Sequence, residues 1–236
     1  NLKRLWVLKT TSRVACGPKP KYVRKIVVGL WEGDFSIALY FELLRLRPLA
    51  DDPIIAAKSL ITLLRALQLG PSHCIIDCFN YVDMIEEIAD MWQPESLNGH
   101  VDAEFAKIIV LFANAVYAKI KFHQNNPGYA CLFHIRGPDD HESQETFEME
   151  EERAMKVAQN LVSILFTLSD VFRQTFVVLV CGKPDSQVVV RSLLKPLVDE
   201  SHCHFIAAKR VLKSINKSDK SNLFSETALN ELNRKF

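Results

Sequence analysis

Apolar side chains recur every three or four residues through most of this chain, and that spacing is the feature that most restricts its fold. It is clearest over residues 102–122, where the apolar positions are Phe105, Ile108, Ile109, Phe112, Val116 and Ile120. Such spacing gathers apolar side chains on one side of an α-helix. No long stretch alternates with a period of two, and only eight glycines and ten prolines interrupt 236 residues. The sequence therefore predicts long helices joined by short turns.

Start and stop signals divide this pattern into separate helices. Asp52-Pro53 is a strong helix start, Gly70-Pro71 ends the helix that follows, and Asp34 is the expected N-cap of a helix that Pro48 stops. Loops are expected over 93–101 and 125–141. Helices are expected over 1–13, 21–31, 35–46, 53–69, 72–80, 81–92, 102–122, 146–180, 185–198, 202–215 and 226–236. Successive helix pairs predict an all-α fold, a right-handed solenoid of antiparallel helical hairpins.

Charge is distributed very unevenly along the chain. The first 31 residues have a net charge of +8, against +1 for the whole chain, so the remainder is −7. A surface built from this segment attracts multivalent anions. Gly17-Pro18 breaks regular structure and places Lys19 and Lys21 at a helix start, where free N–H groups and the helix dipole favour a phosphate. The basic residues, with no acid among them, are Lys3, Arg4, Lys9, Arg13, Lys19, Lys21, Arg24 and Lys25.

Signals for other functional classes are weak. Neither a glycine-rich phosphate loop nor a nucleophile elbow occurs in the sequence. His202-Cys203-His204, and His73-Cys74 with Cys78, do not have a recognisable zinc spacing and are interpreted as ordinary helix residues. The basic segment lacks the interleaved aromatic residues of a nucleic-acid-binding module. We therefore expect a protein that is not an enzyme and that uses no cofactor, no metal and no nucleic acid.

The sequence also carries signals about its compartment. No apolar run reaches the roughly 18 uninterrupted residues that cross a bilayer, so any membrane contact should be peripheral. The six cysteines lack the spacing of a disulfide framework, which favours reduced thiols in a cytosolic protein. The chain begins at Asn1 without a signal-peptide pattern, and we expect it to be a fragment of something longer.

The basic segment resembles the inositide-binding signature of the ANTH domain. This domain is found in clathrin-assembly adaptors and in the huntingtin-interacting, talin-like actin adaptors. The signature has a lysine near the end of the first helix and, after nine intervening residues, a Lys-x-Lys-His that opens the second helix. Lys9, Lys19 and Lys21 match it without a gap, and Tyr22 stands where the family usually has His. Further similarity lies in residues 41–52, 57–62 and 67–71, and the resemblance covers about residues 1–215.

The resemblance implies a phosphoinositide-binding helical domain over residues 1–215, followed by a C-terminal extension over 216–236. It implies that the headgroup of phosphatidylinositol bisphosphate in the cytoplasmic leaflet of the plasma membrane is bound on an exposed basic surface during clathrin-mediated endocytosis. Further implied partners are clathrin-coat components, cargo tails or another ENTH/ANTH-type adaptor. The implied headgroup-binding residues are Lys9, Lys19, Lys21 and Tyr22, with support from Arg13, Arg24 and Lys25.

Two departures from the family pattern predict a weaker site than is usual. The Tyr22 phenol donates one hydrogen bond but does not become cationic as histidine does. Pro20 removes a backbone donor between the two lysines. A second interpretation stays open, in which the chain is a helical scaffold that binds a cargo tail or coat component on the helices after Thr146 without lipid dependence.

Overall fold

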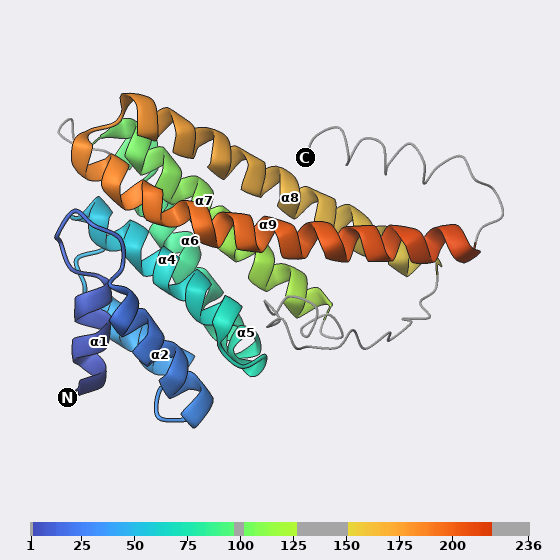
Figure 1. Ribbon diagram of the computed structural model, residues 1–236, viewed down its shortest axis with the longest axis horizontal. Helices are drawn as coiled ribbons and strands as arrows, with labels where there is room; N and C mark the ends of the chain where they lie inside the picture. Colours follow the sequence, from blue (N-terminus) through green and yellow to red (C-terminus); the bar gives the residue numbers. More distant parts are fainter. Residues whose placement is uncertain (1, 97–101, 127–150, 219–236) are drawn as a thin grey trace.

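The computed structural model describes residues 2–96, 102–126 and 151–218, and all regular structure in these ranges is helical (Figure 1). The all-α class predicted from the apolar spacing is therefore confirmed. Two short 3-10 helices, η1 (Cys78–Tyr81) and η2 (Pro94–Ser96), accompany the α-helices. The α-helices are α1 (Leu2–Thr10), α2 (Pro20–Glu32), α3 (Ile37–Arg45), α4 (Pro53–Leu69), α5 (His73–Asp77), α6 (Val82–Met91), α7 (Ala103–Asn125), α8 (Glu151–Cys181) and α9 (Pro184–Ser218).

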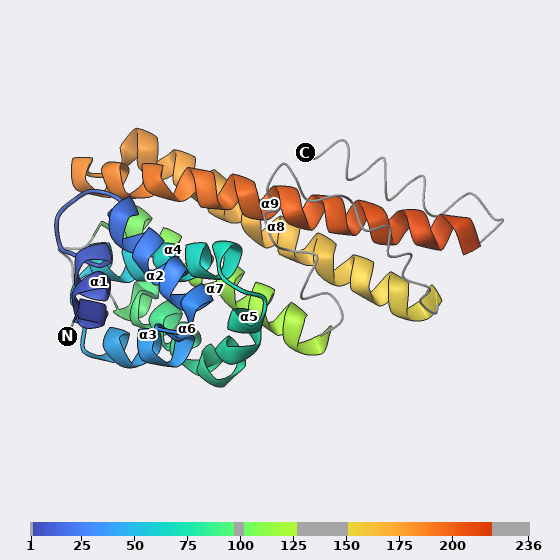
Figure 2. The same ribbon diagram turned by 60° about the horizontal axis from the view of Figure 1, so that its bottom comes forward.

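The helices stack as antiparallel pairs into a superhelix. α1 packs against α2, α6 against α7, and α8 against both α7 and α9. α8 and α9 form a long hairpin that runs along one side of the molecule, as Figures 1 and 2 both show. α9 also returns across α4, so the C-terminal hairpin covers helices from the first half of the chain. The short α1–α2 hairpin lies at one end of this assembly (Figure 1).

α4 is the central helix of the first half of the chain. Asp52 caps it, because its Oδ1 accepts hydrogen bonds from the Ile54 and Ile55 amides at 3.0 and 3.1 Å, and Pro53 is its first residue. These contacts confirm the start signal read from the sequence. Every side chain from Ile55 to Leu64 is buried. A charged residue within that segment, Lys58, must therefore find its partners inside the protein.

Two predictions about the first helices are wrong. The N-cap of α3 is Ser36, whose Oγ accepts from the Leu39 amide at 3.1 Å, and not Asp34. The spacing also predicts an apolar side of the first helix formed by Leu2, Leu5, Trp6 and Leu8, but in α1 Leu2 is 70% exposed and Leu5 is also exposed, whereas Val7 and Thr10 are buried. The spacing alone does not decide which side of a nine-residue helix is covered, because contacts with α2, α3 and α4 set that orientation.

The C-terminal half also differs from expectation. The two helices predicted over 185–198 and 202–215 are one continuous helix, α9, with Pro196 in its interior. Proline removes one hydrogen bond of a helix, but packing against α4 and α8 stabilises this one. Gln68 of α4 donates from Nε2 to the Pro196 carbonyl at 2.9 Å. The expected helix 226–236 and most of the predicted connection 125–141 lie outside the described residues.

α8 is a long helix that is rich in apolar residues. By length and composition alone, its segment Glu152–Cys181 could cross a membrane. Polar residues interrupt this segment, so the sequence analysis did not single it out as an uninterrupted apolar run. Its buried side chains, which include Leu161, Leu165, Leu168 and Val171, belong to the core shared with the neighbouring helices. A core helix of a globular protein meets the same criterion, so the finding is weak evidence for a span.

Candidate functional site

The predicted headgroup-binding lysines lie on both sides of the α1–α2 loop, residues 11–19. Lys9 is in the last turn of α1, Lys19 is the N-cap of α2, and Lys21 is in the first turn of α2. The loop joins the two helices at the end of the hairpin away from the N-terminus (Figure 1). The fold thus brings all three lysines to one end of one hairpin.

These lysines are available to a ligand. Lys9, Lys19 and Lys21 are exposed, and Tyr22 beside them is half-buried. Within the described ranges, no carboxylate forms an ion pair with any of the three ammonium groups. We call Lys9, Lys19, Lys21 and Tyr22 the lysine surface. Its charges are not neutralised by described acidic groups of the same molecule, so they can attract an anion from solution.

The three supporting basic residues have different surroundings. Arg24 is exposed. The Nζ atom of Lys25 lies 5.9 Å from the ring centroid of Trp6, a cation–π distance. Arg13 forms an ion pair with Asp52, with 3.2 Å between Nε and Oδ2. Arg13 therefore already has an acidic partner, whereas Arg24 has an exposed charge.

The start of α2 offers few backbone hydrogen-bond donors to a phosphate group. Lys19 has an extended backbone conformation and makes no side-chain capping hydrogen bond. Pro20 has no N–H, and the amides of Tyr22 and Val23 donate to the Lys19 carbonyl at 2.9 and 3.2 Å. The Lys21 amide is thus the first-turn donor that remains for a phosphate oxygen. Charge on the lysine surface, more than backbone donors, would hold an anion here.

A buried cation holds the α1–α2 loop from beneath. Lys58 of α4 donates from Nζ to the Ser12 carbonyl at 2.8 Å, the Ser12 Oγ at 3.1 Å and the Val14 carbonyl at 3.2 Å. Burial lowers the pKa of Lys58; the charge of nearby Lys19 lowers it further, and Cys16 acts in the opposite direction. Lys58 therefore joins the loop to the core at a point close to Lys19.

Two further contacts fix the same loop. Arg47 donates from Nη2 to the Thr11 carbonyl at 2.8 Å, and the Thr11 hydroxyl donates to the Val7 carbonyl at 2.7 Å. On the other side, Gly17 lies against α9, since a Cβ atom at this position would be 2.5 Å from the Ser192 Cβ. The loop is therefore held by α4, by α9 and by Arg47, which lies between α3 and α4.

The sequence reading did not identify Lys58, Arg47 or Ser192 as parts of this region. Lys58 carries the one available signal, a charged residue in the otherwise uncharged segment 54–64. A helix that is apolar on all sides is buried, and a lysine within it needs internal acceptors. The identity of those acceptors depends on contacts that span 44 to 46 residues, which local spacing does not report.

A second polar cluster lies in the core, where α4, α7 and α9 meet. Lys119 and Glu200 form a buried ion pair with 2.6 Å between Nζ and Oε1, and Gln68 donates to the other Glu200 oxygen at 2.9 Å. Burial alone raises the pKa of Glu200, but the Lys119 charge and the hydrogen bonds from Lys119 and Gln68 lower it overall. Burial lowers the pKa of His204 to about 4, so this imidazole is neutral at pH 7.

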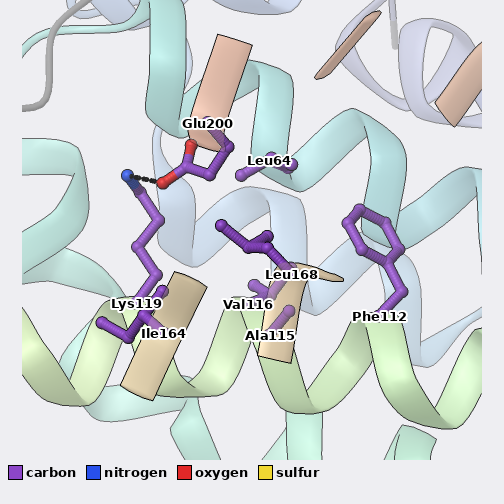
Figure 3. Close-up of a pocket in the computed structure, with 8 residues that line it drawn as sticks. All are labelled: Leu64, Phe112, Ala115, Val116, Lys119, Ile164, Leu168 and Glu200. Atoms are coloured by element: carbon purple, nitrogen blue, oxygen red, sulfur yellow. Dashed lines mark hydrogen bonds and ion pairs between the residues drawn. The ribbon is translucent and has the colours of Figure 1, made fainter. Parts of the chain in front are cut away.

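The cavity beside this ion pair is too small for a ligand (Figure 3). Its volume is about 10 Å³, room for one water molecule at most. Six apolar side chains line it with Lys119 and Glu200, and the dashed contact in Figure 3 is their ion pair. In the described part of the chain no three His, Cys, Asp or Glu side chains are grouped to hold a metal ion. The lysine surface is therefore the stronger candidate site.

The fold and this surface define a class of protein: an all-α superhelical domain that presents a basic surface at its N-terminal hairpin. The particular family follows from comparison with known proteins. The family model of the ANTH domain matches residues 5–215, and the chain belongs to this family. The resemblance found in the sequence is confirmed.

One curated relative and two solved structures are also similar to this chain. Protein SLA2 of Saccharomyces cerevisiae is 26% identical over 142 residues, which are 56% of this chain and 14% of SLA2. The chain thus spans only a small part of this curated relative. The ENTH domain of epsin-2, solved in complex with phosphatidylinositol 4,5-bisphosphate, has a TM-score of 0.77 at 19% identity and covers 99% of this chain and 86% of its own. The endocytic adaptor complex AENTH has a TM-score of 0.69 at 20% identity, covering 98% and 90%.

Proposed function

We propose that this chain is a phosphoinositide-binding membrane-adaptor domain that acts in clathrin-mediated endocytosis. The lysine surface binds the headgroup of phosphatidylinositol bisphosphate in the cytoplasmic leaflet of the plasma membrane, at clathrin-coated pits. Arg24 and Lys25 add positive charge nearby. Arg13, which is paired with Asp52, is a further supporting residue. The domain works by binding, without a catalytic step. Its functional unit is residues 1–215, and 216–236 are an extension.

One observation carries this proposal: three exposed lysines without acidic partners in the described structure gather at one loop. Family membership and the bisphosphate lipid bound by the ENTH domain of epsin-2 support it. Each basic residue near an anionic leaflet contributes about 1 kcal/mol, so three give about 3 kcal/mol. Binding is therefore weak, reversible and salt-sensitive, and stable recruitment needs further contacts with coat components, cargo tails or another ENTH/ANTH-type adaptor.

Vesicle co-sedimentation tests the proposal. We compare the chain with its Lys9→Ala, Lys19→Ala, Lys21→Ala triple variant on phosphatidylcholine vesicles with and without phosphatidylinositol 4,5-bisphosphate. The wild type should sediment with the bisphosphate vesicles, and the triple variant should lose about 3 kcal/mol, a roughly hundredfold fall in affinity. Equal sedimentation of both proteins would show that the lysine surface is not the site.

The matched control has the same loss of charge at other places. Lys107, Lys156 and Lys213 are exposed on α7, α8 and α9, and their triple alanine variant should bind nearly as well as the wild type. Vesicles that carry equal negative charge as phosphatidylserine separate headgroup recognition from attraction to any anionic surface. Equal binding to both anionic vesicles would contradict a specific phosphoinositide function.

A second candidate function, protein binding on the late helices, is favoured by exposed apolar side chains on α8. Phe176 is 59% and Val180 is 78% exposed, and Phe166 is also exposed. In this case the ligand is a cargo tail or coat component, and its binding does not depend on lipid. A pull-down that survives the lysine triple variant but fails with Phe176→Ser and Val180→Ser would favour this function.

A further inference from the structure

We propose that Lys58, which is buried and does not face the lipid, is a positioning residue for the headgroup site. Its ammonium holds the α1–α2 loop so that Lys9 before the loop, Lys19 at its end and Lys21 after it face one headgroup. This inference rests on the proposed function and adds a residue to its machinery. The evidence consists of the burial of Lys58 and its hydrogen bonds to the loop.

The contacts of Lys58 are directed to the loop alone. Its side chain is 0% exposed, and its hydrogen-bond partners in the described structure, Ser12, Val14 and Cys16, all belong to the loop. No carboxylate in the described ranges forms an ion pair with it. A buried ammonium needs such acceptors, and the loop carbonyls need a donor when they are turned away from water. The Lys58 ammonium and the loop carbonyls therefore hold each other in place.

Loss of Lys58 would free the loop that separates the signature lysines. Residues 11–19 contain no α-helix or strand, so their conformation depends on contacts with the rest of the protein. The Thr11, Ser12 and Val14 carbonyls all accept from Arg47 or Lys58, which directs their negative ends inward. Without the Lys58 contacts, Lys19 is no longer held in one place relative to Lys9. A headgroup then contacts fewer cations at once.

The ammonium of Lys58, and not the bulk of its side chain, makes these contacts with the loop. A variant that keeps a cation with hydrogen-bond donors at this position therefore separates Lys58 from a merely space-filling residue.

The test uses the full chain and three variants. Lys58→Met removes the ammonium at similar volume, and Lys58→Arg keeps a cation with several donors. Leu60→Val is a substitution at a buried position of the same helix, and it lowers stability while the Lys58 contacts stay intact. Affinity is measured on phosphatidylcholine vesicles with phosphatidylinositol 4,5-bisphosphate. Hydrogen exchange compares amides of residues 11–19 with those of α7, a readout of loop order that needs no lipid.

We expect Lys58→Met to bind about fivefold more weakly, the effect of losing about one lysine contact. Its loop amides should exchange faster while α7 is no less protected than in Leu60→Val, and Lys58→Arg should recover most of the affinity. If Lys58→Met binds as Leu60→Val does, or its loop exchanges at the wild-type rate, the inference is overturned and the proposed function stands. If the wild type itself ignores bisphosphate vesicles, the proposed function fails first and the inference with it.

A neighbouring variant keeps the test decisive if Lys58→Met does not fold. Arg47→Met removes the contact with the Thr11 carbonyl from a half-buried position. It should also weaken vesicle binding and speed up exchange in the loop, by less than Lys58→Met because it frees one carbonyl and not two. If Arg47→Met has unchanged vesicle affinity and unchanged hydrogen exchange in the loop, the proposal that buried contacts position the loop is overturned.

Discussion

Two lysines are buried in the described part of this domain, and their partners differ. Lys119 is 2% exposed and is neutralised by Glu200, with which it forms a close ion pair between α7 and α9. Lys58 is 0% exposed and is bound by loop carbonyls, which carry no net charge. A paired internal charge stabilises packing but has little field outside the protein. A charge bound by carbonyls and a hydroxyl group is not neutralised by an ion pair, and the charge of Lys58 lies against the α1–α2 loop.

The largest expected effect tests the paired lysine. Lys119→Met leaves the Glu200 carboxylate buried without its closest cation, and the free energy of unfolding should fall by about 3–5 kcal/mol. Urea denaturation measures this loss. The folded fraction should still bind bisphosphate vesicles like the wild type, because the pair lies away from the α1–α2 loop. Adding Glu200→Gln should restore part of the stability, and no restoration would contradict the paired-charge account.

The pH dependence of stability tests the same cluster. Burial lowers the pKa of His204 to about 4 in the folded protein, against an ordinary value of 6.5, so the unfolded chain binds more protons between these values. Stability is therefore full above about pH 6.5 and falls as the pH decreases, by about 2 kcal/mol between about pH 7 and pH 5. Urea denaturation at both values measures it. His204→Gln should remove most of this dependence, and an unchanged slope would assign it to other groups.

A neutral substitution tests the loop without changing any charge. In Gly17→Ala the added methyl group would meet the Ser192 Cβ, so the loop must move away from α9. We expect a modest stability loss of about 1 kcal/mol and an affinity for bisphosphate vesicles about fivefold lower. Co-sedimentation measures the second effect. Ser192→Gly in the same chain makes room for the methyl group and should restore binding; failure to do so would mean that the loop position does not matter.

The smallest expected effect lies at the tyrosine of the signature. Tyr22→His places a titratable group beside Lys19 and Lys21, and its cationic form adds one more charge for the phosphates. Vesicle affinity of this variant should rise about threefold between about pH 7.5 and pH 6, whereas the wild type should change less. Co-sedimentation at the two pH values decides it. If the vesicle affinity of the wild type depends on pH as strongly as that of the variant, the titrating group is not the residue at position 22.

Local sequence signals predicted the fold class and many helix ends, because those depend on neighbouring residues. The Asp52-Pro53 start and the Gly70 stop are examples, and both bound α4 in the structure. The predictions of which side of a helix is buried, and of where a helix is interrupted, failed where contacts between distant residues decide them. Val7 rather than Leu5 faces the core, and Pro196 lies inside a helix that α4 and α8 support.

The candidate site divides in the same way. Lys9, Lys19 and Lys21 were identified because they match the ANTH signature, whose residues lie close together in the sequence. Whether they bind a headgroup is a prediction that only the vesicle experiments test. The residues that hold the loop come from α4, α9 and the segment between α3 and α4, and no periodicity connects them to it. The surface is thus readable from sequence, but its support is not.

The contact between Gly17 and Ser192 has a practical consequence for the size of a usable lipid probe. A synthetic peptide of residues 1–32 contains all the basic side chains of the signature, yet it lacks Arg47, Lys58 and the α9 wall against which residue 17 rests. Such a peptide would coat any acidic membrane without distinguishing one sugar phosphate from another. A discriminating reagent has to extend from the first helix to the last.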